Sequence, residues 1–405
     1  MAGEFFIAKK YFFSKKKVGL ISATAFISIS GFAIGVWALI IALSVLGGFE
    51  REVRDKILSF DSHIKIESSL GEGISDWEEL KTELSRLANP IAIAPYVMGK
   101  AIILKDEKQS VVVLKGTNET GLSEVSKLSS SLIEGNIELE HKDIGGIVVG
   151  RNIAERLLVG IGDTVVVLNP LIASSPFSVP YSTRFVVTGI FSANIFNYDD
   201  VYTYVHYKYA QKFRRMADKV TGIEMSFEDF NESFQTAELL RESGLDGIKV
   251  LTWFDIHRDL LGAMKLEKLG AFVVLSLIIL VAAFNVVSSL VMMVMEKRRE
   301  IGILKAIGAK DRSVAKIFIL SGMFSGIIGI SLGAVSGLLI IWIQKSYGLV
   351  KLPSDIYFID VLPVELDAFE LLAVILVSLT LAFLATLYPA LKAADLQPVE
   401  SIRND

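Results

Sequence analysis

Four long stretches of this sequence contain no charged residue, and they limit the fold more than any other feature. They cover residues 18–49, 269–295, 317–344 and 371–391. A helix of about 20 apolar residues crosses the roughly 30 Å hydrocarbon core of a membrane. The chain is 52% hydrophobic and its mean hydropathy of +0.51 exceeds that of soluble proteins. We therefore expect four transmembrane helices. A cleaved signal peptide is a poorer interpretation of the first stretch, because such peptides have an apolar run of only about 7–15 residues.

The distribution of lysine and arginine predicts the orientation of these spans. Five lysines lie in residues 1–17, and seven basic residues lie in the loop 296–316, whereas residues 345–370 contain only Lys345 and Lys351. Basic loops remain in the cytoplasm. We therefore expect residues 1–17, 296–316 and 392–405 in the cytoplasm, and residues 50–268 and 345–370 outside it.

Aromatic residues alternate with lysines in the N-terminal tail. Phe5, Phe6, Tyr11, Phe12 and Phe13 lie among the basic residues of this segment. This pattern is typical of a helix in the anionic membrane interface. A short orientation signal with apolar residues is the alternative.

Residues 50–268 have the composition and length of a soluble domain, and their periodicity predicts an α+β fold. The predicted strands cover residues 63–67, 98–104, 110–115, 146–149, 164–168, 184–191, 202–206, 222–227 and 248–252. The predicted helices cover residues 77–88, 152–159, 208–217 and 230–243. We expect the early strands to join residues 222–252 in one membrane-proximal part, with residues 117–219 inserted as a subdomain.

One segment of this domain is rich in proline. Residues 169–181 read NPLIASSPFSVPY, with Pro170, Pro176 and Pro180 among apolar residues that have no evident sheet to pack against. The apolar residues are Leu171, Ile172, Phe177 and Val179. Proline favours a stiff, extended loop, and a rigid exposed apolar loop is a candidate binding element. A long hairpin connection folded onto its own domain explains the pattern equally well.

Residue patterns for catalysis are missing from the sequence. No nucleotide-binding loop ending in Gly-Lys-Ser/Thr is present, and His63, His141, His206 and His257 have no metal-ligand spacing. We therefore predict no catalytic residue, no metal site and no cofactor in this chain.

The loop after the second span contains a short amphipathic pattern. In residues 295–311, which read MEKRREIGILKAIGAKD, the apolar residues Ile301, Leu304 and Ile307 recur at helical spacing, with Glu300 beside them. Gly308 is a suitable helix end. Such a helix either lies on the lipid surface or fits a groove on a cytoplasmic partner.

Glycines recur at helical spacing in two spans. The third span contains Gly322, Gly326, Gly329, Gly333 and Gly337, and the first contains Gly31 and Gly35. Small residues at this spacing let helix backbones approach closely in a membrane. Helix packing is therefore the favoured interpretation over contact with a substrate.

Three segments carry a family resemblance. They read GVWALIIALSVLGGFEREVRDKIL, AAFNVVSSLVMMVMEKRREIGILKAIGAKD and LYPALKAADLQPVESIR, at residues 35–58, 282–311 and 387–403. The chain resembles the LolC/LolE lipoprotein-releasing permeases over its full length, and its cytoplasmic motif is similar to those of the wider FtsX and MacB permeases. The resemblance implies a MacB-type ABC permease of the bacterial inner membrane, with four transmembrane helices and a large α+β periplasmic domain between the first two.

The resemblance also implies partners. A dimer of permeases, formed with a second LolC/LolE-type chain or with itself, would bind two copies of the ATPase LolD, which would bind ATP and magnesium. Glu300, Ile301, Leu304, Ile307 and Gly308 match the helix that couples permease to ATPase. The cargo would be acylated lipoproteins, and no nucleic acid is implied.

The first two spans of such permeases line a cavity for the acylated cargo. From spacing and apolar character, we place one side of it at Val36, Leu39, Ile40 and Leu43, and the other at Met264, Leu266, Val273 and Leu277. Ordinary packing between spans would give the same pattern.

The proline-rich loop matches the hook by which LolC-type subunits hold the periplasmic carrier LolA. Its candidate contacts are Pro170, Leu171, Ile172, Pro176, Phe177, Val179 and Pro180. Residues 354–360, which read SDIYFID, are more similar to the LolE type, so the subtype stays open. A mechanotransmission or efflux permease of the FtsX or MacB kind, and a membrane scaffold without transport, are the alternatives.

Overall fold

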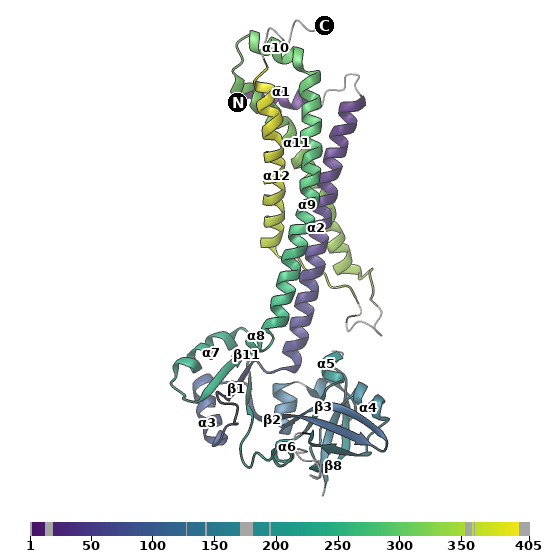
Figure 1. The fold of residues 1–405 in the computed structure, drawn as a ribbon, viewed down its shortest axis with the longest axis vertical. Helices are drawn as coiled ribbons and strands as arrows, with labels where there is room; N and C mark the ends of the chain where they lie inside the picture. The colour runs from purple at the N-terminus through teal and green to yellow at the C-terminus, as the bar shows by residue number, and fades with distance from the viewer. Residues whose placement is uncertain are drawn as a thin grey trace. The chain divides into compact units, whose positions relative to one another are not determined.

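The computed structural model describes residues 2–12, 19–126, 128–141, 144–170, 181–193, 196–352, 359 and 361–396 (Figure 1). The chain forms two compact units. The first consists of Met1–Glu52 and Gly262–Asp405, and the second of Val53–Leu261.

The first unit is helical. Its elements are α1 (Ala2–Phe12), α2 (Gly19–Phe60), α9 (Arg258–Glu296), α10 (Arg298–Ala306), α11 (Asp311–Tyr347) and α12 (Ala368–Ala394), of which α2 and α9 also contribute residues to the second unit. Four of these helices, α2, α9, α11 and α12, are long and apolar enough to cross a membrane. The prediction of four spans is confirmed, and the spans lie inside helices that are longer than the charge-free stretches.

Glycines bring the spans of the first unit together. A methyl group added at Gly35 of α2 would lie 2.9 Å from Ile279 of α9, and one at Gly333 of α11 would lie 2.9 Å from Val36 of α2. Seven residues before Gly333 in α11, a methyl group added at Gly326 would lie 2.7 Å from Ala382 of α12. These separations leave no room for a side chain, which confirms the packing interpretation of the glycine pattern.

The second unit contains the strands of the chain's large domain. They are β1 (Ile64–Ser68), β2 (Ala92–Lys105), β3 (Lys108–Thr117), β4 (Leu132–Gly135), β5 (Glu140–His141), β6 (Ile144–Gly150), β7 (Thr164–Leu168), β8 (Ser182–Phe191), β9 (Tyr202–His206), β10 (Gly222–Ser226) and β11 (Ile248–Thr252). All nine predicted strands are present. The sequence did not predict β4, whose residues are largely exposed, or β5, which has only two residues.

The helices of the second unit also follow the prediction. They are α3 (Trp77–Ala88), α4 (Arg151–Leu157), α5 (Phe196–Asp199), α6 (Tyr207–Arg214), α7 (Glu232–Glu242) and α8 (Trp253–Ile256), with short π and 3₁₀ turns at Gly121–Val125 and Leu128–Ser131. Helix α7 packs beside β11 and α3, whereas α6 packs on β2 and β3 (Figure 1). Each of the four predicted helices lies within two or three residues of the observed bounds.

Strand β2 belongs to two sheets. Its first residues, Ala92–Tyr96, pair with β10 and complete the antiparallel sheet β11-β1-β10-β2. From Val97 onward it pairs with β3, and the pairings β2-β3-β9-β6-β8-β7-β2 close a ring of six strands. We call the first part the small sheet and the second the barrel.

The barrel corrects the predicted subdomain boundary at residue 117. The predicted strands 98–104 and 110–115 belong to the barrel rather than to the part that contains residues 222–252, so the inserted subdomain begins near Val97. The sequence could not show this, because β2 changes partners between Tyr96 and Val97 without a turn residue.

Candidate functional site

The amphipathic pattern in residues 295–311 forms a short helix, as expected. Helix α10 ends at Ala306, and Gly308 has a φ of +103°, a conformation that favours glycine. The Gly308 amide donates to the Lys305 carbonyl at 3.0 Å, and the Ala309 amide donates to the Leu304 carbonyl at 3.0 Å. Gly308 therefore ends the helix in the way that its residue type suggested.

Only part of the predicted docking face points outward. Ile307 is 81% exposed, Glu300 is exposed and Leu304 is half-buried, whereas Ile301 is fully buried with Val314 and Phe318 of α11. Ile303, which the sequence reasoning missed, is 46% exposed and lies four residues before Ile307. The helix has two apolar stripes, and spacing alone did not show which one faces the spans. In this structure Ile301 anchors the helix, and Ile303 takes its place on the outward face.

A partly buried lysine, Lys305, links α10 to two spans. The Lys305 ammonium donates to the backbone carbonyls of Ala394 and Leu396 at the end of α12, at 2.9 Å for Leu396. It also forms an ion pair with Asp311, the first residue of α11, at 2.7 Å. Cations are stabilised at the carbonyl end of a helix. Lys305 therefore links α10 to α11 and α12 at once.

The N-terminal helix holds the opposite end of α10. The Lys297 ammonium lies 2.6 Å from the Glu300 carboxylate and 5.3 Å from the ring centre of Tyr11 of α1. Burial, and then the neighbouring Glu300 carboxylate, raise the pKa of the Tyr11 hydroxyl above its ordinary value. Helix α1 also packs on α11, where the Phe5 and Phe324 ring centres are 5.5 Å apart. Among the described residues, α1 thus contacts both α10 and α11.

The two predicted sides of the cargo cavity do not face each other within the chain. Val36, Leu39, Ile40 and Leu43 are buried, and Val36 and Ile40 pack on Gly333 and Gly337 of α11. On α9, Leu266, Val273 and Leu277 are exposed and Met264 is half-buried. Val36 and Ile40 face α11 because its glycines allow close approach there. Within this chain, the four buried α2 residues therefore form core rather than a cavity wall.

Other residues than those predicted for the cavity are exposed on the first two spans. Ile34 and Trp37 of α2 are exposed, as are Val281 and Phe284 of α9. Asn285 lies beside Phe284 and is also exposed. In the described part of the chain, the Asn285 amide has no hydrogen-bond partner.

The candidate carrier-binding loop connects β7 to β8 of the barrel. Residues 171–180, which include Leu171, Ile172, Pro176, Phe177, Val179 and Pro180, lie outside the described residues, and Pro170 is exposed at the loop's start. The base is well anchored. The Asn169 amide donates to the Tyr181 carbonyl at 3.1 Å, and the buried Asn169 side chain donates to the Phe213 carbonyl at 2.8 Å.

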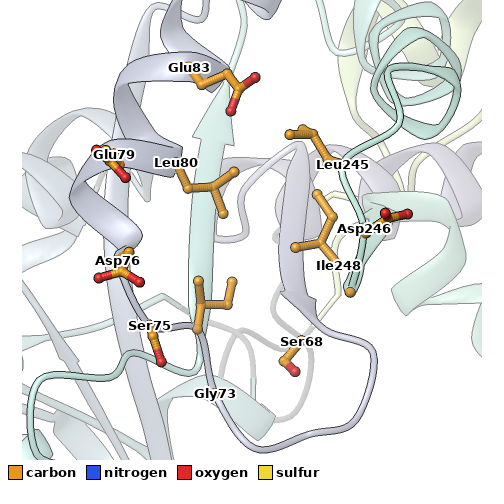
Figure 2. Close-up of a pocket in the computed structure, with 12 residues that line it drawn as sticks. Ser68, Gly73, Ser75, Asp76, Glu79, Leu80, Glu83, Leu245, Asp246 and Ile248 are labelled. Carbon is orange, nitrogen blue, oxygen red and sulfur yellow. The ribbon is translucent and has the colours of Figure 1, made fainter.

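A pocket of about 360 Å³ lies elsewhere in the second unit, beside α3 and the ends of β1 and β11 (Figure 2). Carboxylates from Asp76, Glu79, Glu83 and Asp246 surround it, and Leu80 lies on its wall. Its residues come from separate segments of the chain, so this acidic pocket could not be predicted from local sequence patterns.

Comparison with known proteins places these units in families. The model of the FtsX-like permease C-terminal domain matches residues 272–398, and that of the MacB-like periplasmic core domain matches residues 25–242. Among solved structures, the chain is similar to the periplasmic region of MacB from Actinobacillus actinomycetemcomitans, with 14% identity, a TM-score of 0.34, and coverage of 50% of this chain and 94% of that one.

Curated relatives match almost the whole length. The lipoprotein-releasing system transmembrane protein LolC of Neisseria meningitidis serogroup B is 33% identical over 99% of both chains. The corresponding LolE of Haemophilus influenzae is 30% identical over 98% of both. The chain therefore belongs to the LolC/LolE family of lipoprotein-releasing system transmembrane proteins.

Proposed function

We propose that this chain is a permease subunit of an ATP-driven ABC transporter, which extracts lipoproteins from the outer leaflet of the inner membrane and passes them to a periplasmic carrier. The full-length match to LolC and LolE proteins carries this proposal. The four-span bundle and the domain that matches a periplasmic core domain fit a multi-pass inner-membrane protein. We further propose that both termini lie in the cytoplasm, because basic residues cluster in residues 1–17 and 296–316 and an even number of spans returns the chain to the side on which it began.

The proposed ATPase is a separate LolD-like subunit, present in two copies, which binds ATP and magnesium. Its docking site is the outward face of α10, formed by Glu300, Ile303 and Ile307 with Leu304 at its edge. Exposed apolar residues at positions i and i+4 suit a groove on a partner. Since Ile301 and Lys305 fix the opposite face to α11 and α12, a displacement of α10 would reach the spans directly.

The proposed cargo path follows the outward face of α9, including Leu266, Val273 and Leu277. Each buried CH₂ group of an acyl chain contributes about 0.8 kcal/mol, so an apolar surface of this kind can hold a lipid anchor. The exposed Asn285 side chain favours contact with another protein chain within the membrane, because lipid hydrocarbon cannot form a hydrogen bond with its amide and a protein can. A second LolC/LolE-type permease, or a second copy of this chain, would provide the opposite wall.

The proposed carrier is a LolA-like protein held by the loop 169–181. The loop's base is pinned by Asn169, and three prolines reduce the entropy lost when such a loop is ordered in a complex. A LolC-like, LolE-like or combined subtype is compatible with this proposal.

Reconstitution tests the function. The chain, purified with its native partners and placed in liposomes with a triacylated lipoprotein, should transfer that lipoprotein to the soluble carrier when ATP is added. An efflux or mechanotransmission permease would hydrolyse ATP without this transfer, and a scaffold would copurify with no ATPase. Either result would refute the proposal.

A further inference from the structure

A chain of buried charges runs through the second unit. Asp61 directly follows α2, Lys65 lies on β1 and Glu224 lies on β10. The Lys65 ammonium is 2.6 Å from the Asp61 carboxylate and 3.5 Å from that of Glu224. The chain continues at both ends, since Lys115 of β3 lies 2.8 Å from Glu224 and His257, directly before α9, lies 3.1 Å from Asp61. We call these five residues the charge cluster.

The cluster is largely buried, although Lys65 and His257 keep 12% and 19% of their side chains exposed. Asp61 is 5% exposed, Lys115 5% and Glu224 2%. Burial opposes the charge on Asp61, but Lys65 and His257 hold the pKa of its carboxyl well below the usual range. Burial likewise opposes the charge on Lys65, and Asp61 and Glu224 hold its pKa above the ordinary value. Two carboxylates and two ammonium groups therefore neutralise one another inside the domain.

Stability alone is a weak explanation for such a cluster. Burial of charged groups costs desolvation free energy, which offsets most of the gain from their mutual attraction. Well-packed apolar residues stabilise a core at least as well. What paired buried charges add is a defined geometry, because each group has to meet its partner at hydrogen-bond distance. The aromatic ring of Tyr96 completes the enclosure, with the Lys65 and Lys115 ammonium groups 6.0 Å and 5.7 Å from its centre.

The position of the cluster shows which parts it holds. In the described residues, β2 is the one strand that the small sheet and the barrel share. The ion pair between Lys115 of the barrel and Glu224 of the small sheet is a second link between them. Asp61 and His257 add the ends of α2 and α9, the two helices with residues in both compact units.

We propose that Asp61, Lys65, Lys115, Glu224 and His257 act as a positioning joint, which fixes the ends of α2 and α9 to the small sheet and the small sheet to the barrel. Movement of the two helices is thereby transmitted to the barrel. Without the joint, the small sheet could rotate relative to the barrel about β2, and the barrel would not follow the helices. The expected effect on lipoprotein release rests on the proposed function, whereas the fixed arrangement of helix ends, small sheet and barrel does not.

The test measures a distance and a coupling ratio in the complete complex. Since the chain has no cysteine, spin labels can be attached to cysteines at Leu70, after β1, and Val111, on β3, which are 83% and 67% exposed. Lys115→Met removes the link between sheet and barrel. The matched control is Lys105→Met, which breaks a more exposed pair with Asp163.

Lys115→Met should broaden the distance distribution between the labels and lower the lipoprotein released per ATP hydrolysed on the order of fivefold, whereas the control should change neither. Asp61→Asn should lower the same ratio, because it releases the helix ends. If Lys115→Met fails to fold, Lys115→Arg keeps the charge but changes its position and should still broaden the distribution. An unchanged distribution and ratio in a folded variant would overturn the joint, even if its melting temperature fell. A wild-type complex that releases no lipoprotein would refute the proposed function and leave the distance test decisive for the joint.

Discussion

Replacing Lys305 by methionine should free α10 from the end of α12 while keeping the length of the side chain. The substitution removes two hydrogen bonds from the Lys305 ammonium to backbone carbonyls. Each hydrogen bond from a charged group contributes about 1.5–3 kcal/mol to stability. The ion pair with Asp311 adds little, since the Asp311 side chain is 72% exposed. We therefore expect α10 to open more easily by about 3 kcal/mol.

Amide hydrogen exchange measures this opening directly. A change of about 3 kcal/mol corresponds to roughly 100-fold faster exchange of the α10 amides. The control is Lys310→Met, which removes an exposed lysine from the same loop. Because Ile303 and Ile307 remain in place, the ATPase should still bind, but ATP-driven release should fall. Equal exchange rates in α10 of Lys305→Met and wild type would show that this lysine does not anchor the helix.

Four further outcomes are expected. Ile307→Asp should reduce the ATPase that copurifies with the chain by about tenfold or more, as for an interface anchor, and a full yield would remove α10 as the docking site. Gly333→Val should destabilise the bundle in detergent by about 1–3 kcal/mol through overpacking, whereas Gly262→Val, with open space around it, should not; equal melting temperatures would contradict the packing. Phe177→Ala should weaken carrier binding by about 30-fold, or ~2 kcal/mol, and unchanged affinity would reduce the loop to a connection. Because the folded pKa of Asp61 is depressed, its contribution to stability should be present above about pH 4 and be lost as the pH falls further; the difference in unfolding free energy between wild type and Asp61→Asn should therefore narrow in acid.

Local patterns predicted most of the elements of this fold. Apolar and polar residues alternate in β1, and β9 is rich in aromatic and β-branched residues. Helix α3 has the predicted bounds Trp77–Ala88 because polar residues mark its start and end. The change of partners within β2 was hidden, because an extended strand looks the same whichever neighbour it pairs with.

The sequence could not predict which way a side chain faces or which residues distant in sequence come into contact. Ile301 and Ile303 are both apolar residues of one short helix, and only the packing of α11 decides which of them is buried. Val36 has the same apolar character whether it faces lipid, cargo or Gly333. The charge cluster was invisible for a similar reason, since Asp61 and Glu224 are far apart in sequence and only the small sheet brings them to Lys65.

Closure of the barrel restricts how a partner can bind it. Each of the six ring strands has a hydrogen-bonded neighbour on both sides, so a foreign strand could be added only where a ring strand extends past its neighbour, as β3 does before Val113. The same closure protects the ring from edge-to-edge aggregation between copies. Strand β7 already pairs with β8 along its whole length. Substitutions in the connection between these two strands can therefore change the affinity for a carrier that docks there without disturbing backbone pairing in the barrel.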